Sequence, residues 1–404
     1  MKSFSQQLQE SLADRQSQGL YRQRKTITSP QSTEVIVNDK LLVNFCSNDY
    51  LGLANHPEVV TACKEGIDRY GVGSGASHLV VGHSHAHHAL EEELADFTGR
   101  SRALLFSSGY MANVGTLTAL VNKNDCIYED KLNHASLLDG GIFSGAKFKR
   151  YPHLNIAKLS ELIGNKPESE NTFIVSDGVF SMDGDCAELP RLIDVAKNNQ
   201  AQLVLDDAHG FGVLGRNGGG LIKYYQECGH YIDEENLPVV IGTLGKAFGT
   251  QGAFVVGSEA LIENLIQFCR PYIYTTAISP ALAEASRTSL KLIKKEQWRR
   301  EKLQALIKTF RIRCAELGFA LTNSMTPIQG LIIGNAEKSL EASRLLENEG
   351  IYVTAIRPPT VPKGTARLRI TFSANHTEEQ LAVLLLALEK IQPRITLEEV
   401  NVSG

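Results

Sequence analysis

Three polar side chains stand directly after apolar runs of the sequence, where they could take part in chemistry. Asp206 ends the run QLVLD, His209 follows three residues later, and Lys246 lies in a glycine-rich loop after the run PVVIG. The four residues on each side of Lys246 carry no other charge. Such surroundings disfavour a protonated amine, so the lysine could act as a nucleophile or base. The alternative is a surface lysine, the usual location of this residue type.

An aspartate at a strand end can pair with a protonated ring nitrogen, but Asp206 alone is equally well explained as the N-cap of a helix. The segment SSGYMAN at 107–113 has a glycine turn that opens a helix. The free N–H groups of such a turn suit a phosphate, although the turn is a weak signal by itself. Together, the aspartate, the histidine and the isolated lysine indicate a pyridoxal phosphate site.

These residues must be positioned by the strands and helices around them. The alternation of apolar runs and amphipathic helical stretches predicts an α/β protein with a mainly parallel sheet. Amphipathic helical stretches, for example 86–98 and 188–198, lie between most of the apolar runs. In such sheets, ligands bind at the carboxyl ends of the strands. The apolar runs that read as buried strands are 103–106, 172–176, 202–206, 238–242 and 253–257.

The two ends of the chain do not follow the strand–helix alternation of the middle. Helical spacing at 3–18 places Phe4, Leu8 and Leu12 on one side, and an extended segment with an Asn-Asp turn follows at 34–45. A long charged helical stretch covers 280–317. Beyond it we expect strands near 329–333, 351–355 and 367–372 and helices near 336–349 and 377–391. We therefore expect an N-terminal segment (1–55), a large α/β domain (56–285) and a small C-terminal α+β domain (286–404).

Composition excludes several classes of protein. The 404 residues include 43% hydrophobic and 21% charged residues, which is typical of a globular chain and not of a disordered or fibrous one. The formal net charge of -4 gives little support for binding nucleic acid. Seven scattered cysteines without a CxxC motif favour a reducing compartment. The polar N-terminus and the short apolar run at 381–388 predict neither a signal peptide nor a membrane span, so we expect a cytoplasmic protein.

The cluster HSHAHH at 83–88 is the one pattern that suggests a metal. His83 and His87 are four residues apart, and such pairs on a helix can bind zinc. No carboxylate or cysteine spacing completes a site, so we predict that no metal is bound.

Ten segments, in one order along nearly the whole chain, resemble the α-oxoamine synthases, a family of fold-type I pyridoxal phosphate enzymes. The resemblance implies their fold, with a large cofactor-binding domain and a smaller C-terminal domain. The segments are 44–57, 71–78, 87–99, 104–113, 132–140, 176–185, 203–215, 243–249, 272–280 and 355–376.

The resemblance also implies roles for individual residues. Lys246 matches the lysine that forms the Schiff base with the cofactor, Asp206 the carboxylate paired with the pyridine nitrogen, and His134 the histidine stacked on the cofactor ring. Catalysis would therefore rest on Lys246, His134 and Asp206. The further cofactor-binding positions would be Gly109, Tyr110, Ser181, His209, Thr243, Thr275 and Thr276, the last two reaching the phosphate from a second subunit of an obligate homodimer. The substrate-binding positions would be Arg22, Asn48, His134, Thr360 and Arg369, with Arg369 holding the amino acid carboxylate.

Within the family, the segment PPTVPKGTARLR at 358–369 points to the branch that serves biotin biosynthesis. Its members condense L-alanine with pimeloyl-CoA, or with a pimeloyl group on acyl carrier protein, and release CO2 and the free thiol. The alternatives are another member, such as glycine C-acetyltransferase, and a non-catalytic binding protein on the same scaffold. Two positions depart from the family pattern: Phe211 replaces a small or polar residue, and His78 stands where many members have arginine.

Overall fold

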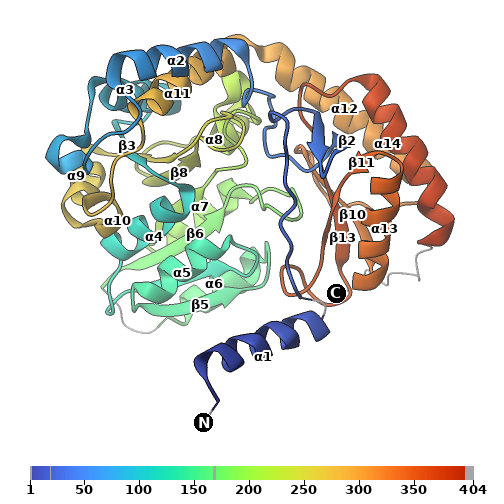
Figure 1. Cartoon of the computed structure of the whole chain (residues 1–404). Coiled ribbons are helices and arrows are strands. Elements are labelled where there is room, and N and C mark those ends of the chain that lie inside the picture. Colours follow the sequence, from blue (N-terminus) through green and yellow to red (C-terminus); the bar gives the residue numbers. More distant parts are fainter. Residues whose placement is uncertain (1, 19, 167–169, 396–404) are drawn as a thin grey trace.

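The fold of the chain is taken from a computed structural model, which describes residues 2–18, 20–166 and 170–395. A seven-stranded sheet with helices on its faces forms one part of the molecule (Figure 1). Strand β9 is antiparallel to both of its neighbours, and the pairs among β4 to β8 are parallel. The strand order is β3 (Arg102–Phe106), β9 (Ala253–Gly257), β8 (Val239–Thr243), β7 (Gln202–Asp206), β6 (Thr172–Asp177), β4 (Cys126–Asp130) and β5 (Lys147–Tyr151).

Both faces of this sheet are buried. Neighbouring residues of β7, Val204 and Leu205, belong to two separate apolar clusters, because successive side chains of a strand point to opposite faces. This double burial explains why the strands are continuous apolar runs. The helices of this part are α2 (Pro57–Tyr70), α3 (His85–Thr98), α4 (Gly109–Leu120), α5 (Ala135–Phe143), α6 (Ile156–Gly164), α7 (Leu189–Asn198), α8 (Gly220–Glu227), α9 (Glu259–Phe268), α10 (Arg270–Ile273) and α11 (Pro280–Lys295), with short turns η1 (His78–Gly82) and η2 (Arg216–Gly218).

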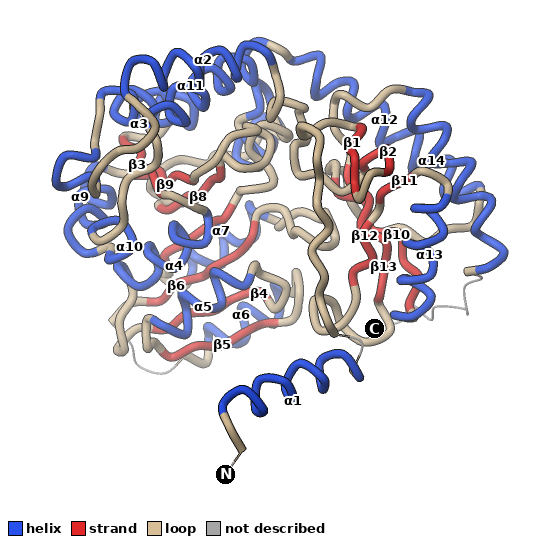
Figure 2. Tube along the Cα trace, in the orientation of Figure 1, coloured by secondary structure: helices blue, strands red, loops and turns tan. Residues whose placement is uncertain are grey.

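A second part of the molecule is built on an antiparallel sheet of order β10 (Ile328–Gly334), β13 (Ala366–Thr371) and β12 (Thr354–Ile356). Around it lie α12 (Gln297–Glu316), α13 (Ala336–Asn348), α14 (Glu378–Ile391) and the turn η3 (Gln392–Arg394) (Figure 2). The N-terminal hairpin β1 (Glu34–Val37) and β2 (Lys40–Asn44) pairs with β11 (Ile351–Tyr352). Residues from the two ends of the sequence therefore share one small sheet.

The structure confirms the α/β class and the predicted strands of the large sheet, with two corrections elsewhere. The helical stretch 280–317 is two helices, because the backbone leaves the helical region at Glu296 (φ -100°, ψ 67°). The strand expected at 351–355 is two short strands, β11 and β12, which belong to different sheets. Helix α1 (Phe4–Ser17) forms as expected, but Phe4, Leu8 and Leu12 are all exposed. No helix within the described ranges is long and apolar enough to cross a bilayer.

Candidate active site

The polar residues that follow β6, β7 and β8 meet at one edge of the large sheet. The three strands are adjacent and parallel, with Asp177 paired to Asp206 and Asp206 to Ile241. Lys246 follows the end of β8 by three residues. Parallel strands end at the same edge, so the fold brings together the aspartate and the lysine that the sequence singled out.

Asp206 is fixed by hydrogen bonds to both of its oxygens. It is only 8% exposed, its Oδ1 accepts from the backbone N–H of Ala208 at 2.9 Å, and its Oδ2 accepts from Asn113 Nδ2 at 2.6 Å. Asn113 also donates to Ser136 Oγ at 2.8 Å, and that oxygen lies 2.7 Å from Nδ1 of His134. The carboxylate is therefore held in one orientation and linked to the histidine expected beside the cofactor.

Sequence reasoning missed Asn113 and Ser136 as members of this network. Asn113 lies on α4 and is 1% exposed, while Ser136 lies in the first turn of α5. A buried asparagine inside an apolar helix was the available signal, because a buried amide needs partners.

The surroundings of Lys246 favour its neutral amine. Burial lowers the pKa of this lysine to about 8, against the attraction of Asp206 and Asp177, and the positive charge of Arg369 acts in the same direction as burial. A lysine with such a pKa supplies a free amine near neutral pH, as a nucleophile or base requires.

The neighbouring carboxylates do not all carry charge. Burial, followed by the charge of Asp206, raises the pKa of Asp177 well above its ordinary value. Burial likewise raises the pKa of Asp207 to about 8. The protonated form of Asp207 is thus favoured at neutral pH, and the shift of Asp177 acts in the same direction, which lessens the repulsion among three adjacent carboxylates.

The lowered pKa of Lys246 gives a pH prediction. The cofactor-free protein should capture an aldehyde through this amine at a rate that rises with pH and levels off above about 8. An ordinary lysine would show the same rise in capture rate near pH 10.4. Borohydride trapping of pyridoxal phosphate at several pH values, located by peptide mass mapping, measures the midpoint. A midpoint near that of an exposed lysine would contradict the desolvated environment.

A second network joins His209 to the other part of the molecule. His209 Nδ1 lies 2.7 Å from the hydroxyl of Tyr50, which donates to Asn48 Oδ1 at 3.2 Å. Arg369 on β13 donates through Nη2 to the same Asn48 oxygen at 3.1 Å and through Nε to the carbonyl of Ser181 at 2.7 Å. Burial, together with the charges of Lys246 and Arg369, lowers the pKa of His209 well below its usual range. His209 therefore sits here as a neutral imidazole.

Two arginines of β13 have different partners. Arg367 forms an ion pair with Asp183 and donates through Nε to the carbonyl of Thr365 at 3.0 Å. Within the described part of the chain, Arg369 has no carboxylate at ion-pair distance. The guanidinium of Arg369 therefore keeps donors for an incoming carboxylate, whereas that of Arg367 is already paired.

The start of α4 lies close to the end of β8. Ser108 caps α4 by accepting from the N–H of Met111 at 3.3 Å, and a Cβ added to Gly109 would lie 4.0 Å from Thr243 Oγ1. Thr243 Oγ1 in turn accepts from the N–H of Gly245 at 3.2 Å. A helix N-terminus beside a hydroxyl group is a suitable site for a phosphate.

A cavity of about 570 Å³ opens beside Lys246 and is also lined by Asn48, Cys46 and Tyr352. Its size is in the range of small-molecule sites.

Several other residues expected at the site form no hydrogen bond with Lys246 among the described residues. Tyr110 bonds to Asp139, Thr276 accepts from Ser107 through its carbonyl, Thr275 is half-buried on the same segment, and Arg22 and Thr360 are exposed.

The histidine cluster forms around η1 and the start of α3. Nitrogens of His78, His83 and His87 lie within 4.8 Å of one another. Both ring nitrogens of His87 are used, since Nδ1 accepts from the N–H of Ser84 at 3.0 Å and Nε2 donates to the carbonyl of Ile278 at 2.7 Å. This supports a structural role for His87, and the absence of a bound metal stays a prediction.

Comparison with known proteins gives consistent results. Residues 40–388 match the family aminotransferase class I and II. The 8-amino-7-oxononanoate synthase of Pseudomonas putida strain F1 is 57% identical over 384 residues, covering 95% of this chain and 97% of that protein. A solved structure of serine palmitoyltransferase with pyridoxal phosphate superposes with a TM-score of 0.91 at 29% identity, covering 98% and 100% of the two chains.

A crystal structure of 8-amino-7-oxononanoate synthase from Francisella tularensis is also similar, with 34% identity, a TM-score of 0.76 and coverage of 87% and 98% of the two chains. The family match covers most of the sequence, and the relative from Pseudomonas putida aligns along almost its whole length. The chain therefore belongs to the aminotransferase class I and II family and, within it, to the 8-amino-7-oxononanoate synthases.

Proposed function

We propose that this chain condenses L-alanine with a pimeloyl thioester, giving 8-amino-7-oxononanoate, CO2 and the free thiol carrier, as a step of biotin biosynthesis. The observation that carries this proposal is that a desolvated Lys246 and a fixed Asp206 lie at one edge of the large sheet, and that the charge of Arg369, from β13 of the small sheet, acts on Lys246. The names of the relatives from Pseudomonas and Francisella support the choice of substrates.

The residues present fit pyridoxal phosphate as the cofactor. Lys246 offers an amine for its aldehyde, Asp206 a carboxylate for its ring nitrogen, and the start of α4 with Thr243 a place for its phosphate. When bound, this cofactor supplies an aromatic ring that accepts the electron pair released at the Cα of the amino acid.

The side chains of the site divide the remaining work. Arg369 binds the carboxylate of alanine, so its fork orients the substrate. Lys246, with its lowered pKa, accepts the proton from Cα and later returns one to the product. His134, an exposed residue at the start of α5, donates a hydrogen bond to the thioester oxygen as negative charge develops there. Asp206 keeps the proton on the ring nitrogen of the cofactor.

An assay of alanine and glycine, each with pimeloyl-CoA and acetyl-CoA, tests the proposal through the release of CO2. We expect turnover with alanine and pimeloyl-CoA. Turnover with glycine and acetyl-CoA instead would support glycine C-acetyltransferase, the alternative that the relatives do not favour. Absence of both turnover and bound cofactor would support a non-catalytic binding protein.

We also propose a cytoplasmic homodimer in which each active site uses two chains, with Thr275 and Thr276 contacting the phosphate in the partner subunit. Support comes from the surface beside them. Leu79, Val80 and Val81 are consecutive apolar residues and 50–77% exposed. Ser77, two residues before Leu79, forms a β-bridge with Thr276. Exposed apolar residues that lie together in this way are typical of an interaction surface.

Shared sites predict complementation between damaged chains. Inactive Lys246→Ala chains mixed with chains carrying Thr275→Ala and Thr276→Ala should regain part of the activity, since one of the two sites in each hybrid dimer is intact. The mixture is assayed for CO2 release after subunit exchange, which differently tagged chains can verify. Verified exchange without any recovery would contradict a shared site.

A further inference from the structure

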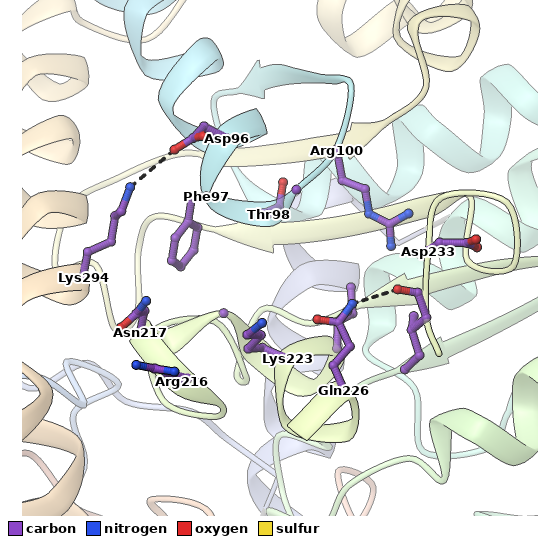
Figure 3. A pocket seen from close by; sticks show the side chains of 14 residues that line it. Asp96, Phe97, Thr98, Arg100, Arg216, Asn217, Lys223, Gln226, Asp233 and Lys294 are labelled. Atoms are coloured by element: carbon purple, nitrogen blue, oxygen red, sulfur yellow. Dashed lines mark hydrogen bonds and ion pairs between the residues drawn. The ribbon is translucent and has the colours of Figure 1, made fainter. Parts of the chain in front are cut away.

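A basic pocket lies away from Lys246, where the end of α3 faces η2 and α8 (Figure 3). Its volume is about 360 Å³, near the lower end of the range for small-molecule sites. None of the residues that line it belongs to the candidate active site. The cationic side chains in its wall are Arg100, Arg216, Lys223 and Lys294, and the acidic ones are Asp96 and Asp233.

Arg100 is the unusual member of this wall. The residue is 8% exposed, and its Nη1 is buried without a hydrogen-bond partner in the part of the chain that the structure describes. Burial lowers the pKa of Arg100, and the charges of Glu234 and Asp233 only oppose this effect. A buried guanidinium that lacks an acceptor costs free energy, which an entering anion would recover.

The nearby carboxylates are already engaged. Glu234 accepts from the N–H and hydroxyl of Ser101 at 3.0 and 3.1 Å. Asp233 accepts from the backbone N–H groups of Glu235 and Asn236. Neither lies at ion-pair distance from Arg100 among the described residues. Among the described residues, Nη1 of Arg100 therefore has no acceptor at hydrogen-bond distance.

The other charges leave the pocket positive. Lys294 pairs with Asp96 at 3.4 Å, as the dashed line in Figure 3 shows. The remaining pocket cations, Arg100, Arg216 and Lys223, then face Asp233 in the wall and Glu234 beside Arg100, an excess of one positive charge. An anion matches this positive excess, and the planar fork of arginine suits a phosphate group.

Apolar side chains complete the wall. Phe97, Ile222 and Ile232 line the same cavity. A bare phosphate ion would leave most of the 360 Å³ and this apolar surface unused. We propose that the pocket binds a small organic phosphate monoester, with Arg100 and Lys223 holding the phosphate and the apolar wall contacting the carbon part.

The wall of the pocket also touches the active-site loops. The ring of Phe97 packs 6.2 Å from that of Phe211 and 6.4 Å from that of Phe248, centroid to centroid. Phe211 stands two residues after His209, and Phe248 two residues after Lys246. Phe211 also contacts Phe254 and is 1% exposed, so this departure from the family pattern belongs to the core between the two sites.

The test uses the holoenzyme, whose cofactor phosphate subsite is filled, with inorganic phosphate and phenyl phosphate as probes. Calorimetric titration at low salt should show binding of both, with phenyl phosphate the tighter. Arg100→Gln and Lys223→Gln should each weaken phenyl phosphate binding about tenfold or more, as expected for the loss of a charge-assisted contact. Lys197→Gln, which removes an exposed charge on α7, is the matched control and should bind as the wild type does.

Each outcome of the titration either supports or overturns the proposed phosphate site. Weakened binding of phenyl phosphate in both pocket variants, with unchanged melting temperature, supports the site. Equal affinity in all four proteins, or no binding of phenyl phosphate, overturns it. Because the readout is binding, a failure of the proposed condensation would leave this result unaffected. If Arg100→Gln fails to fold, the Lys223→Gln comparison alone decides.

Discussion

Replacing Lys246 by alanine should abolish both the covalent attachment of the cofactor and the condensation reaction. Lys246 has a pKa lowered to about 8 by burial, and it lies at the strand edge beside Asp206. General base catalysis contributes about 10²–10⁴-fold to a rate, and covalent attachment is lost as well, so we expect turnover to fall by at least about 10³-fold. Cofactor absorbance, borohydride trapping and CO2 release measure the two effects separately.

Lys197→Ala is the control for this experiment, because it removes a lysine from the exposed end of α7. It should keep the trapped cofactor and normal turnover. A Lys246→Ala protein that still held a borohydride-trapped cofactor and turned over normally would show that another amine does this work. Noncovalently bound cofactor without turnover would agree with the prediction, since the phosphate and ring contacts remain.

The sequence predicted the strands that carry the chemistry because each is buried on both faces. The run 202–206 coincides with β7, and 238–242 differs from β8 by one residue at each end. It did not predict β4 and β5. Glu129 and Asp130 of β4 are fully buried acids, and β5 reads KFKRY, an edge strand of mostly polar residues. An apolar run is absent in both, so the pattern that identifies central strands fails there.

The sequence predicted the chemically active residues of the site but not the residues that hold them in place by hydrogen bonds. Asp206, His209 and Lys246 stand out locally, because each follows an apolar strand. The roles of Asn113 and Ser136 depend on how closely the first turns of α4 and α5 approach β7, which no local pattern records. The direction of β9 could not be predicted either, because an apolar run has the same period in parallel and antiparallel pairs.

Replacing Arg369 by alanine should weaken the binding of alanine steeply while leaving the cofactor attached to Lys246. Arg369 donates to the carbonyl of Ser181 and to Asn48, and it has no acidic partner among the described residues. Losing the contact with the substrate carboxylate should cost roughly 2–5 kcal/mol, which is about 30-fold to several thousand-fold in the dissociation constant. Titration of alanine, followed by the change in cofactor absorbance, measures this constant.

Arg367→Ala is the matched control, because it removes an arginine from the same face of β13. Arg367 is 4% exposed and paired with Asp183, so its loss leaves a partly buried carboxylate uncompensated and should lower the melting temperature. Its effect on alanine binding should be small. The two variants therefore separate two roles for these arginines: Arg369 binds substrate, and Arg367 joins β13 to the loop after β6.

If Arg369→Ala lowered the melting temperature and left alanine affinity unchanged, Arg369 would instead be a structural residue. Arg369→Lys, which keeps the charge and loses the fork, should bind alanine with intermediate affinity if a bidentate contact is made.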